Sequence, residues 1–140
     1  MISEEKIRSC ISDVYSEIIS IRRDIHQHPE LSEHEERTEQ VISTWLTRWG
    51  IPHATGVAGH GVVGVIQGKA ASQPAPKYEA VAIRADIDAL PIQERNDVPY
   101  RSQNDGVMHA CGHDAHAAEL LATAKILWEL RSQFRGTVKL

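Results

Sequence analysis

Residues 108–128 read MHACGHDAHAAELLATAKILW, a loop rich in histidine that runs directly into a helical pattern. Apolar residues recur three or four positions apart after Asp114, a favourable N-cap, so the sequence predicts a helix from there to about Phe134. Cys111 and His113 are spaced by one residue, and alternate positions of an extended segment direct side chains to the same side. Thiolate and imidazole bind borderline cations such as Zn²⁺ or Mn²⁺. The loop therefore indicates half of a metal site.

The same loop allows other interpretations. No second Cys/His pair follows at zinc-finger spacing, so a metal site would need ligands from elsewhere. In a structural alternative, His109 and His116 are surface residues and Cys111 is a small buried hydrophobic residue. In a redox alternative, Cys111 is a reactive thiol of a regulatory module and binds no metal. The residues alone leave these alternatives open.

Composition and charge indicate one globular domain and exclude two classes of partner. The 140 residues are 41% hydrophobic and 24% charged, with a net charge of -4 and both signs interleaved. Lys and Arg form no basic run, so nucleic acid is not an expected partner. No apolar stretch approaches bilayer length, and the first residues lack signal-peptide features, so we expect a cytoplasmic protein without a membrane partner. Cys10 and Cys111 lie in contexts too different to suggest a disulfide framework.

Hydrophobic periodicity predicts the remaining elements. Helices are expected over residues 3–28 and about 35–49, ended by Pro29 and Gly50. Strands are expected over residues 61–67, 79–87 and 137–140, with residues 68–77 as a surface hairpin loop and 91–106 as an irregular connection. Residues 81–86 resemble a central strand that is buried on both faces and turns polar at its end. This order predicts an α/β fold with helices packed on a mixed, mainly parallel central sheet.

Two carboxylates follow that buried strand. Asp86 and Asp88 lie where open α/β sheets gather ligands, so one could orient a metal-bound histidine or water while the other braces the loop. In the alternative, Asp88 caps the turn before Leu90 and Asp86 pairs with Arg84 in solvent. For Asp88 the two alternatives carry equal weight.

Three segments in order along the chain carry a resemblance to a known family: residues 21–32 (IRRDIHQHPELS), 81–91 (VAIRADIDALP) and 108–116 (MHACGHDAH). They resemble the metal-dependent amidohydrolases that cleave N-acyl amino acids, such as hippurate hydrolase, auxin-conjugate hydrolase and N-acetyldiaminopimelate deacetylase. These enzymes belong to the carboxypeptidase and aminoacylase clan. The resemblance implies a zinc-peptidase-like catalytic domain, a small N-acyl amino acid as substrate, and two divalent metal ions. Zn²⁺ or Mn²⁺ is expected, and Co²⁺ or Ni²⁺ also suits such ligands.

The resemblance assigns roles to a few residues of this sequence. It implies that Cys111 and His113 are metal ligands and that Asp86 supports the catalytic centre. Arg84 falls where relatives in the wider clan carry a histidine ligand. No direct catalytic role carries over to the other polar motif residues, which are Asp88, His109, Asp114 and His116. His26 and His28 are expected to be helix-end packing or surface residues and not ligands.

The resemblance also implies that the site is incomplete within these residues. In the family, a general-base glutamate, further metal ligands and a lid and dimerisation domain come from sequence beyond position 140. We therefore expect residues 1–140 to be the N-terminal portion of a metallohydrolase catalytic domain, with little amide hydrolysis on its own. The alternative is a non-catalytic truncated fragment, whose exposed edge at Val138 would favour homo-oligomers.

Overall fold

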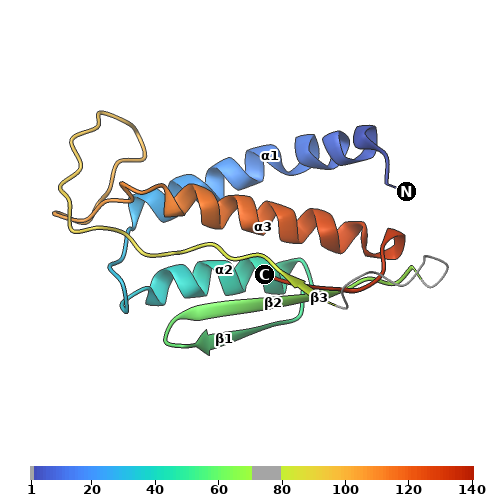
Figure 1. The fold of residues 1–140 in the computed structure, drawn as a ribbon. Helices are drawn as coiled ribbons and strands as arrows, with labels where there is room; N and C mark the ends of the chain where they lie inside the picture. The colour runs from blue at the N-terminus through green and yellow to red at the C-terminus, as the bar shows by residue number, and fades with distance from the viewer. Residues whose placement is uncertain (1, 71–79) are drawn as a thin grey trace.

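Three helices and a four-stranded sheet form a layered α/β fold in this computed structural model, which describes residues 2–70 and 80–140. The helices are α1 (Glu4–Gln27), α2 (Glu36–Arg48) and α3 (His113–Glu129), followed by a short 3-10 turn, η1 (Arg131–Gln133). The strands are β1 (His53–Val57), β2 (Gly61–Gln67), β3 (Ala80–Ala82) and β4 (Thr137–Lys139). Figure 1 shows α3 between α1 on one side and the layer of α2 and the sheet on the other. None of the helices described is long and apolar enough to cross a membrane.

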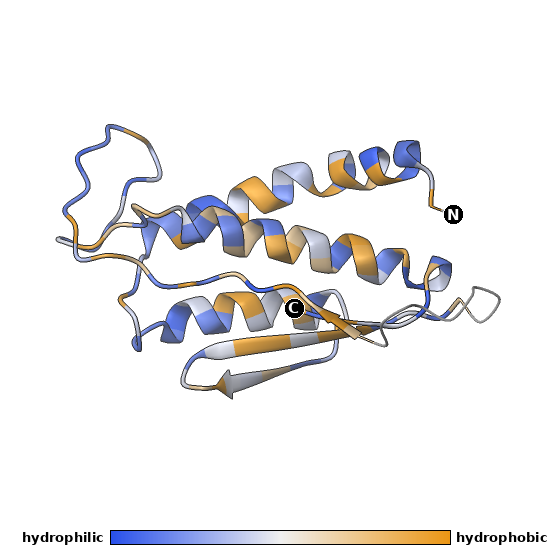
Figure 2. Cartoon of the chain, in the orientation of Figure 1, coloured by the Kyte–Doolittle hydropathy of each residue, from blue (hydrophilic) through white to orange (hydrophobic). Residues whose placement is uncertain are grey.

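The core lies where α3 meets both α1 and the sheet. Ile25 of α1 and Ile66 of β2 are completely buried, and small residues on α3 let the neighbouring elements approach it closely. The buried core residues are Ile21, Ile25, Leu46, Ile51, Ile66, Ala117, Leu121, Ala124 and Val138. In Figure 2 most of β2 is coloured hydrophobic, whereas the long loop before α3 is largely hydrophilic. Each helix therefore contributes one apolar stripe to a single core.

The N-terminal ends of α1 and α2 are stabilised by side chains that accept hydrogen bonds from free backbone amides. The Ser3 hydroxyl accepts a hydrogen bond from the Lys6 amide at 3.2 Å, which caps the start of α1. At α2 the carboxylate of Glu30 accepts hydrogen bonds from the Arg37 and Thr38 amides at 2.9 and 2.8 Å. A carboxylate from the preceding segment thus satisfies free amides at the positive end of α2. Both predicted helices are confirmed to within a residue at each end.

The sheet is mixed, as predicted, but its parallel pairing is in the minority. Its strand order is β1-β2-β4-β3; β1 and β2 pair antiparallel, β2 and β4 antiparallel, and β3 and β4 parallel. The expectation of a mainly parallel sheet is therefore wrong for the described residues. The unpredicted β1 adds an antiparallel partner through a short turn, in which Gly59 adopts φ +102°. The predicted hairpin between the strands at 61–67 and 79–87 is also wrong, because β4 lies between them; residues 71–79 of its loop lie outside the described chain.

The strand predicted over residues 79–87 is shorter and more exposed than expected. Residue 79 is not described, and regular pairing covers only Ala80–Ala82. The Ile83 amide donates to the Lys139 carbonyl at 2.9 Å, and beyond this point the chain runs on outside the strand. Val81 and Ile83 are 50% and 43% exposed, so burial on both faces is wrong here. The cause is that β3 lies at the edge of the described sheet, where β4 is its one paired neighbour.

Candidate metal centre

Cys111 and His113 lie at the junction between the long loop and α3. The chain turns sharply there, and Gly112, not the predicted Asp114, is the N-cap of α3. Gly112 has φ +82°, a left-handed backbone conformation that residues other than glycine seldom adopt. Cys111 is exposed and forms no disulfide with Cys10. The glycine therefore places a free thiol two residues before the first residue of a helix.

His113 is oriented by the carboxylate segment. Its Nδ1 lies 3.0 Å from the backbone carbonyl oxygen of Asp88 and 3.0 Å from Oδ1 of the same residue. Because a carbonyl oxygen can only accept, Nδ1 carries a proton, and in the neutral form of this tautomer Nε2 is the nitrogen with a free lone pair. A carboxylate and a carbonyl that fix the tautomer in this way are the usual outer partners of a metal-bound histidine. Of the two alternatives for Asp88, the structure thus shows the contact that orients a histidine.

Asp86 has a different partner from Asp88. It forms an ion pair with Arg84, in which the side chains are 38% and 83% exposed, as in the solvated alternative considered from the sequence. Among the residues that the structure describes, no group of three or more His, Cys, Asp or Glu side chains is arranged to hold a metal ion. Cys111 and His113 nevertheless offer an accessible thiol and a correctly protonated imidazole, which fit two positions of a metal site. Their role as ligands, and that of Asp86 as a supporting residue, stay predictions.

A buried polar network lies directly behind this loop. Asp114 is completely buried, and its Oδ2 contacts Arg22 Nε at 2.8 Å and His26 Nδ1 at 2.7 Å. His26 Nε2 in turn lies 3.1 Å from Oε1 of the buried Glu94. Burial alone would raise the pKa of Glu94. Hydrogen bonds from the Ser102 amide, from His26 and from Asn96 outweigh burial, so the pKa of Glu94 is lowered overall. His26 is thus packed at the helix end as expected, but within a charged network.

His109 is a second buried histidine in the same region. His109 is only 4% exposed, and its ring centroid lies 6.4 Å from that of His26. Burial lowers the pKa of His109, against the opposing charge of Asp114. Neither ring nitrogen of His109, nor Oδ1 of Asp114, has a hydrogen-bond partner among the described residues. The surroundings of the loop are therefore rich in buried polar groups.

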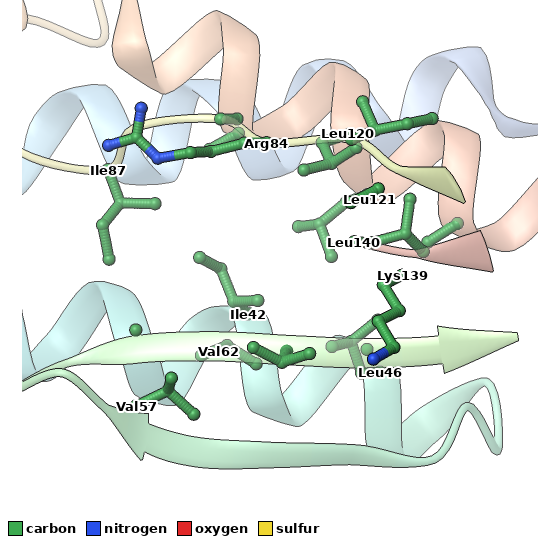
Figure 3. A pocket seen from close by; sticks show the side chains of 18 residues that line it. Ile42, Leu46, Val57, Val62, Arg84, Ile87, Leu120, Leu121, Lys139 and Leu140 are labelled. Carbon is green, nitrogen blue, oxygen red and sulfur yellow. The ribbon is translucent and has the colours of Figure 1, made fainter. Parts of the chain in front are cut away.

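An apolar cavity of about 410 Å³ lies between β2 and residues 83–87. Figure 3 shows Ile87 facing Ile42 and Val62 across this space, with Leu121 of α3 at its side. On the β2 side of the cavity, the last hydrogen bonds of the sheet join Gly64 to Leu140. On the opposite side, the last one joins the Ile83 amide to the Lys139 carbonyl. Cys111, His113 and Asp86 do not line the cavity. It is consequently a gap within the sheet layer and lies apart from the predicted metal ligands.

Sequence reasoning missed Asp114, Arg22 and Glu94 as members of one network. A signal was present for Asp114, because Ala117 and Ala118 follow it three and four positions later and are both buried. An acidic residue on the apolar face of a helix requires a polar partner. The partners of Asp114 are His26 and Arg22, which lie 88 and 92 positions earlier, so a local sequence pattern could not identify them.

Comparison with known proteins bears on the whole arrangement. Residues 82–140 match peptidase family M20/M25/M40. The N-acyl-L-amino acid amidohydrolase of Geobacillus stearothermophilus is 43% identical over 98% of this chain and 35% of its own length. An N-acetylcysteine deacetylase of Bacillus subtilis is 43% identical over 89% of this chain and 32% of its own. The crystal structure of the Bacillus subtilis YXEP protein, a dinuclear metal-binding peptidase of the M20 family, superposes with a TM-score of 0.82 at 42% identity, over 91% of this chain and 35% of that one.

These matches confirm the resemblance carried by the three motifs. The class of protein that the fold and the motifs resemble is the M20 group of peptidases and amidohydrolases, whose family model matches residues 82–140 of this chain. It spans about a third of the length of the relatives it matches.

Proposed function

We propose that the whole protein is a metal-dependent amide hydrolase that releases an amino acid from a small N-acyl amino acid. The observation that carries the proposal is the orientation of His113 by Asp88, beside an exposed Cys111 thiol, in a chain similar to N-acyl amino acid amidohydrolases. The residues of this chain correspond to the N-terminal portion of the catalytic domain. The general base, the remaining ligands and a lid domain belong to other parts of the whole protein.

Each residue has a defined task in this proposal. Cys111 and His113 would each bind a divalent metal ion. The donor atom of Cys111 would be its thiolate sulfur, and that of His113 would be Nε2. Asp88 keeps the proton on Nδ1 of His113, and Asp86 supports the centre from the neighbouring segment. Two such ions, when bound, polarise the scissile carbonyl and lower the pKa of water. Zn²⁺ or Mn²⁺ is the proposed metal, with Co²⁺ or Ni²⁺ accepted by the same donors. A thiolate ligand requires reduced cysteine, which agrees with a cytoplasmic location.

The decisive experiment measures the rate at which Cys111 is alkylated in the whole protein, with and without added Zn²⁺ or Mn²⁺. We expect metal to protect Cys111, and we expect Cys111→Ser and His113→Ala to abolish hydrolysis of N-acetyl and N-benzoyl amino acids. Cys10→Ser is the matched control, because Cys10 is a free cysteine buried in α1 and away from the loop. Loss of activity in the control, or full activity of Cys111→Ser, would contradict the proposal.

A thiol-based regulatory role is the second candidate, and the exposure of Cys111 favours it. The same experiment separates the two functions. An alkylation rate indifferent to metal would support a free reactive thiol. Residues 1–140 alone are expected to bind metal weakly and to show negligible turnover; robust turnover by this chain would show that its own residues contain the general base.

A further inference from the structure

The first of the three motifs, residues 21–32, has no task in the proposed function. Its polar residues nevertheless reach the loop that carries Cys111 and His113. Arg22 and His26 lie one turn apart on α1, and both contact Oδ2 of Asp114, at 2.8 and 2.7 Å. Asp114 immediately follows His113 and is completely buried. The N-terminal motif is thus bonded to the residue next to a predicted ligand.

The same histidine also holds the chain on the other side of the ligands. His26 Nε2 lies 3.1 Å from Oε1 of Glu94, and Oε2 of Glu94 accepts a hydrogen bond from the Ser102 amide at 2.6 Å. Tyr100 from this loop meets the His26 ring edge-on, with centroids 5.5 Å apart, and the Arg22 guanidinium lies 5.0 Å from its ring centroid. The loop before Cys111 and the helix after His113 are therefore anchored to one point on α1.

Anchoring at both ends limits how the intervening segment can move. A buried carboxylate that loses its cation leaves an uncompensated charge, so these contacts break only at a high free-energy cost. The two buried carboxylates differ in what they fix: Asp114 fixes the first turn of α3, and Glu94 fixes the long loop. Residues 95–113 lie between these two carboxylates, and Cys111 to His113 form the end of that stretch directly before Asp114, with the thiol exposed.

We propose that Arg22, His26, Glu94 and Asp114 are positioning residues, which hold Cys111 and His113 in the arrangement that binds metal. This inference rests on the proposed metal-binding function of the two ligands. It gives the N-terminal motif a role in the chemistry of a loop about 90 residues later in the chain. In this proposal the network acts on the two ligands through the conformation of the loop.

The test compares Asp114→Asn and Arg22→Gln with wild type in the whole protein. Zn²⁺ affinity is measured by competition with a chromophoric chelator, and the Co²⁺-substituted proteins are examined for the thiolate-to-metal absorption band of Cys111. Partners outside the ligand shell commonly contribute about tenfold to hundredfold to affinity, and we expect a loss in this range together with a shifted or weakened band. Glu17→Gln is the matched control, because Glu17 pairs with Lys125 at 2.7 Å between the same two helices. It should lower stability without altering affinity or the band.

The outcomes separate this inference from the proposed function. If wild type binds metal and the two variants keep its affinity and its Co²⁺ band while losing only thermal stability, the positioning role is refuted. If wild type shows no metal-thiolate band, the proposed function fails instead. The alkylation rate of Cys111 in metal-free protein then tests the network: a changed rate in Asp114→Asn but not in Glu17→Gln supports positioning, and equal rates overturn it.

Discussion

Replacing Asp88 by alanine tests how the histidine ligand is held. The Nδ1–H of His113 is shared between Oδ1 and the backbone carbonyl of Asp88, each at 3.0 Å, so Asp88→Ala removes one acceptor and keeps the other. The tautomer of His113 survives, but the ring gains freedom to rotate. Losing an outer partner of a metal ligand costs about tenfold to hundredfold in affinity. Because half of the contact remains, and the His113 and Asp88 side chains are 21% and 28% exposed, we expect the lower limit. This is about tenfold, or ~1.4 kcal/mol.

The measurement is a competition titration of Zn²⁺ against a chromophoric chelator, in the whole protein and in its Asp88→Ala variant. Asp105→Ala serves as control, since it removes one carboxylate from an exposed position in the long loop. Unchanged affinity in Asp88→Ala would show that the contact with His113 does not orient a ligand. A loss far beyond a hundredfold would refute the reasoning in the other direction, because it would make Asp88 itself a ligand.

Two further predictions concern the fold. Gly68→Ala places a Cβ 2.5 Å from the Phe134 carbonyl oxygen, so we expect about 1–3 kcal/mol of destabilisation in urea unfolding, whereas at Gly64 the nearest atom is 3.7 Å away and alanine should be tolerated. The hydrogen bond between Glu39 and His60 lowers the Glu39 pKa below 4.5 and raises the His60 pKa above 6.5. Stabilisation from Glu39 is present above about pH 4.5 and is lost as pH falls through its lowered pKa, whereas that from His60 is present below about pH 6.5 and is lost as pH rises through its raised pKa. The melting-temperature difference between wild type and His60→Asn should therefore be largest between these values at low salt, and a difference independent of pH would contradict the assignment.

The elements that the sequence predicted well are those with local causes. The stripe of α1, its Ser3 cap and the apolar run of β2 each depend on residues a few positions apart. The strand predicted over residues 79–87 is longer than the observed β3, because an apolar run does not show whether a neighbouring strand pairs with it. β1 escaped notice because His53–Val57 is short and mostly exposed, with no apolar alternation to reveal it.

The candidate site divides in the same way. Cys111 and His113 could be proposed from spacing and from family resemblance. Asp88 could not be assigned, since its contact with His113 joins residues 25 positions apart. Asp114 was interpreted as a cap because acidic residues favour helix starts, and its burial against α1 overrides that preference. Long-range polar contacts are what the sequence alone left unresolved.

The place of β4 in the sheet has a consequence for the order of folding. β1 and β2 are joined by a short turn and can associate as soon as both exist, whereas β4 pairs Thr137 with Gln67, 70 positions earlier. Until Thr137–Lys139 is synthesised and docks, β2 and β3 each present an open edge to the surrounding solution. The β1–β2 hairpin therefore forms with an open edge along β2, and β4 covers that edge only after the chain has extended 70 positions beyond Gln67.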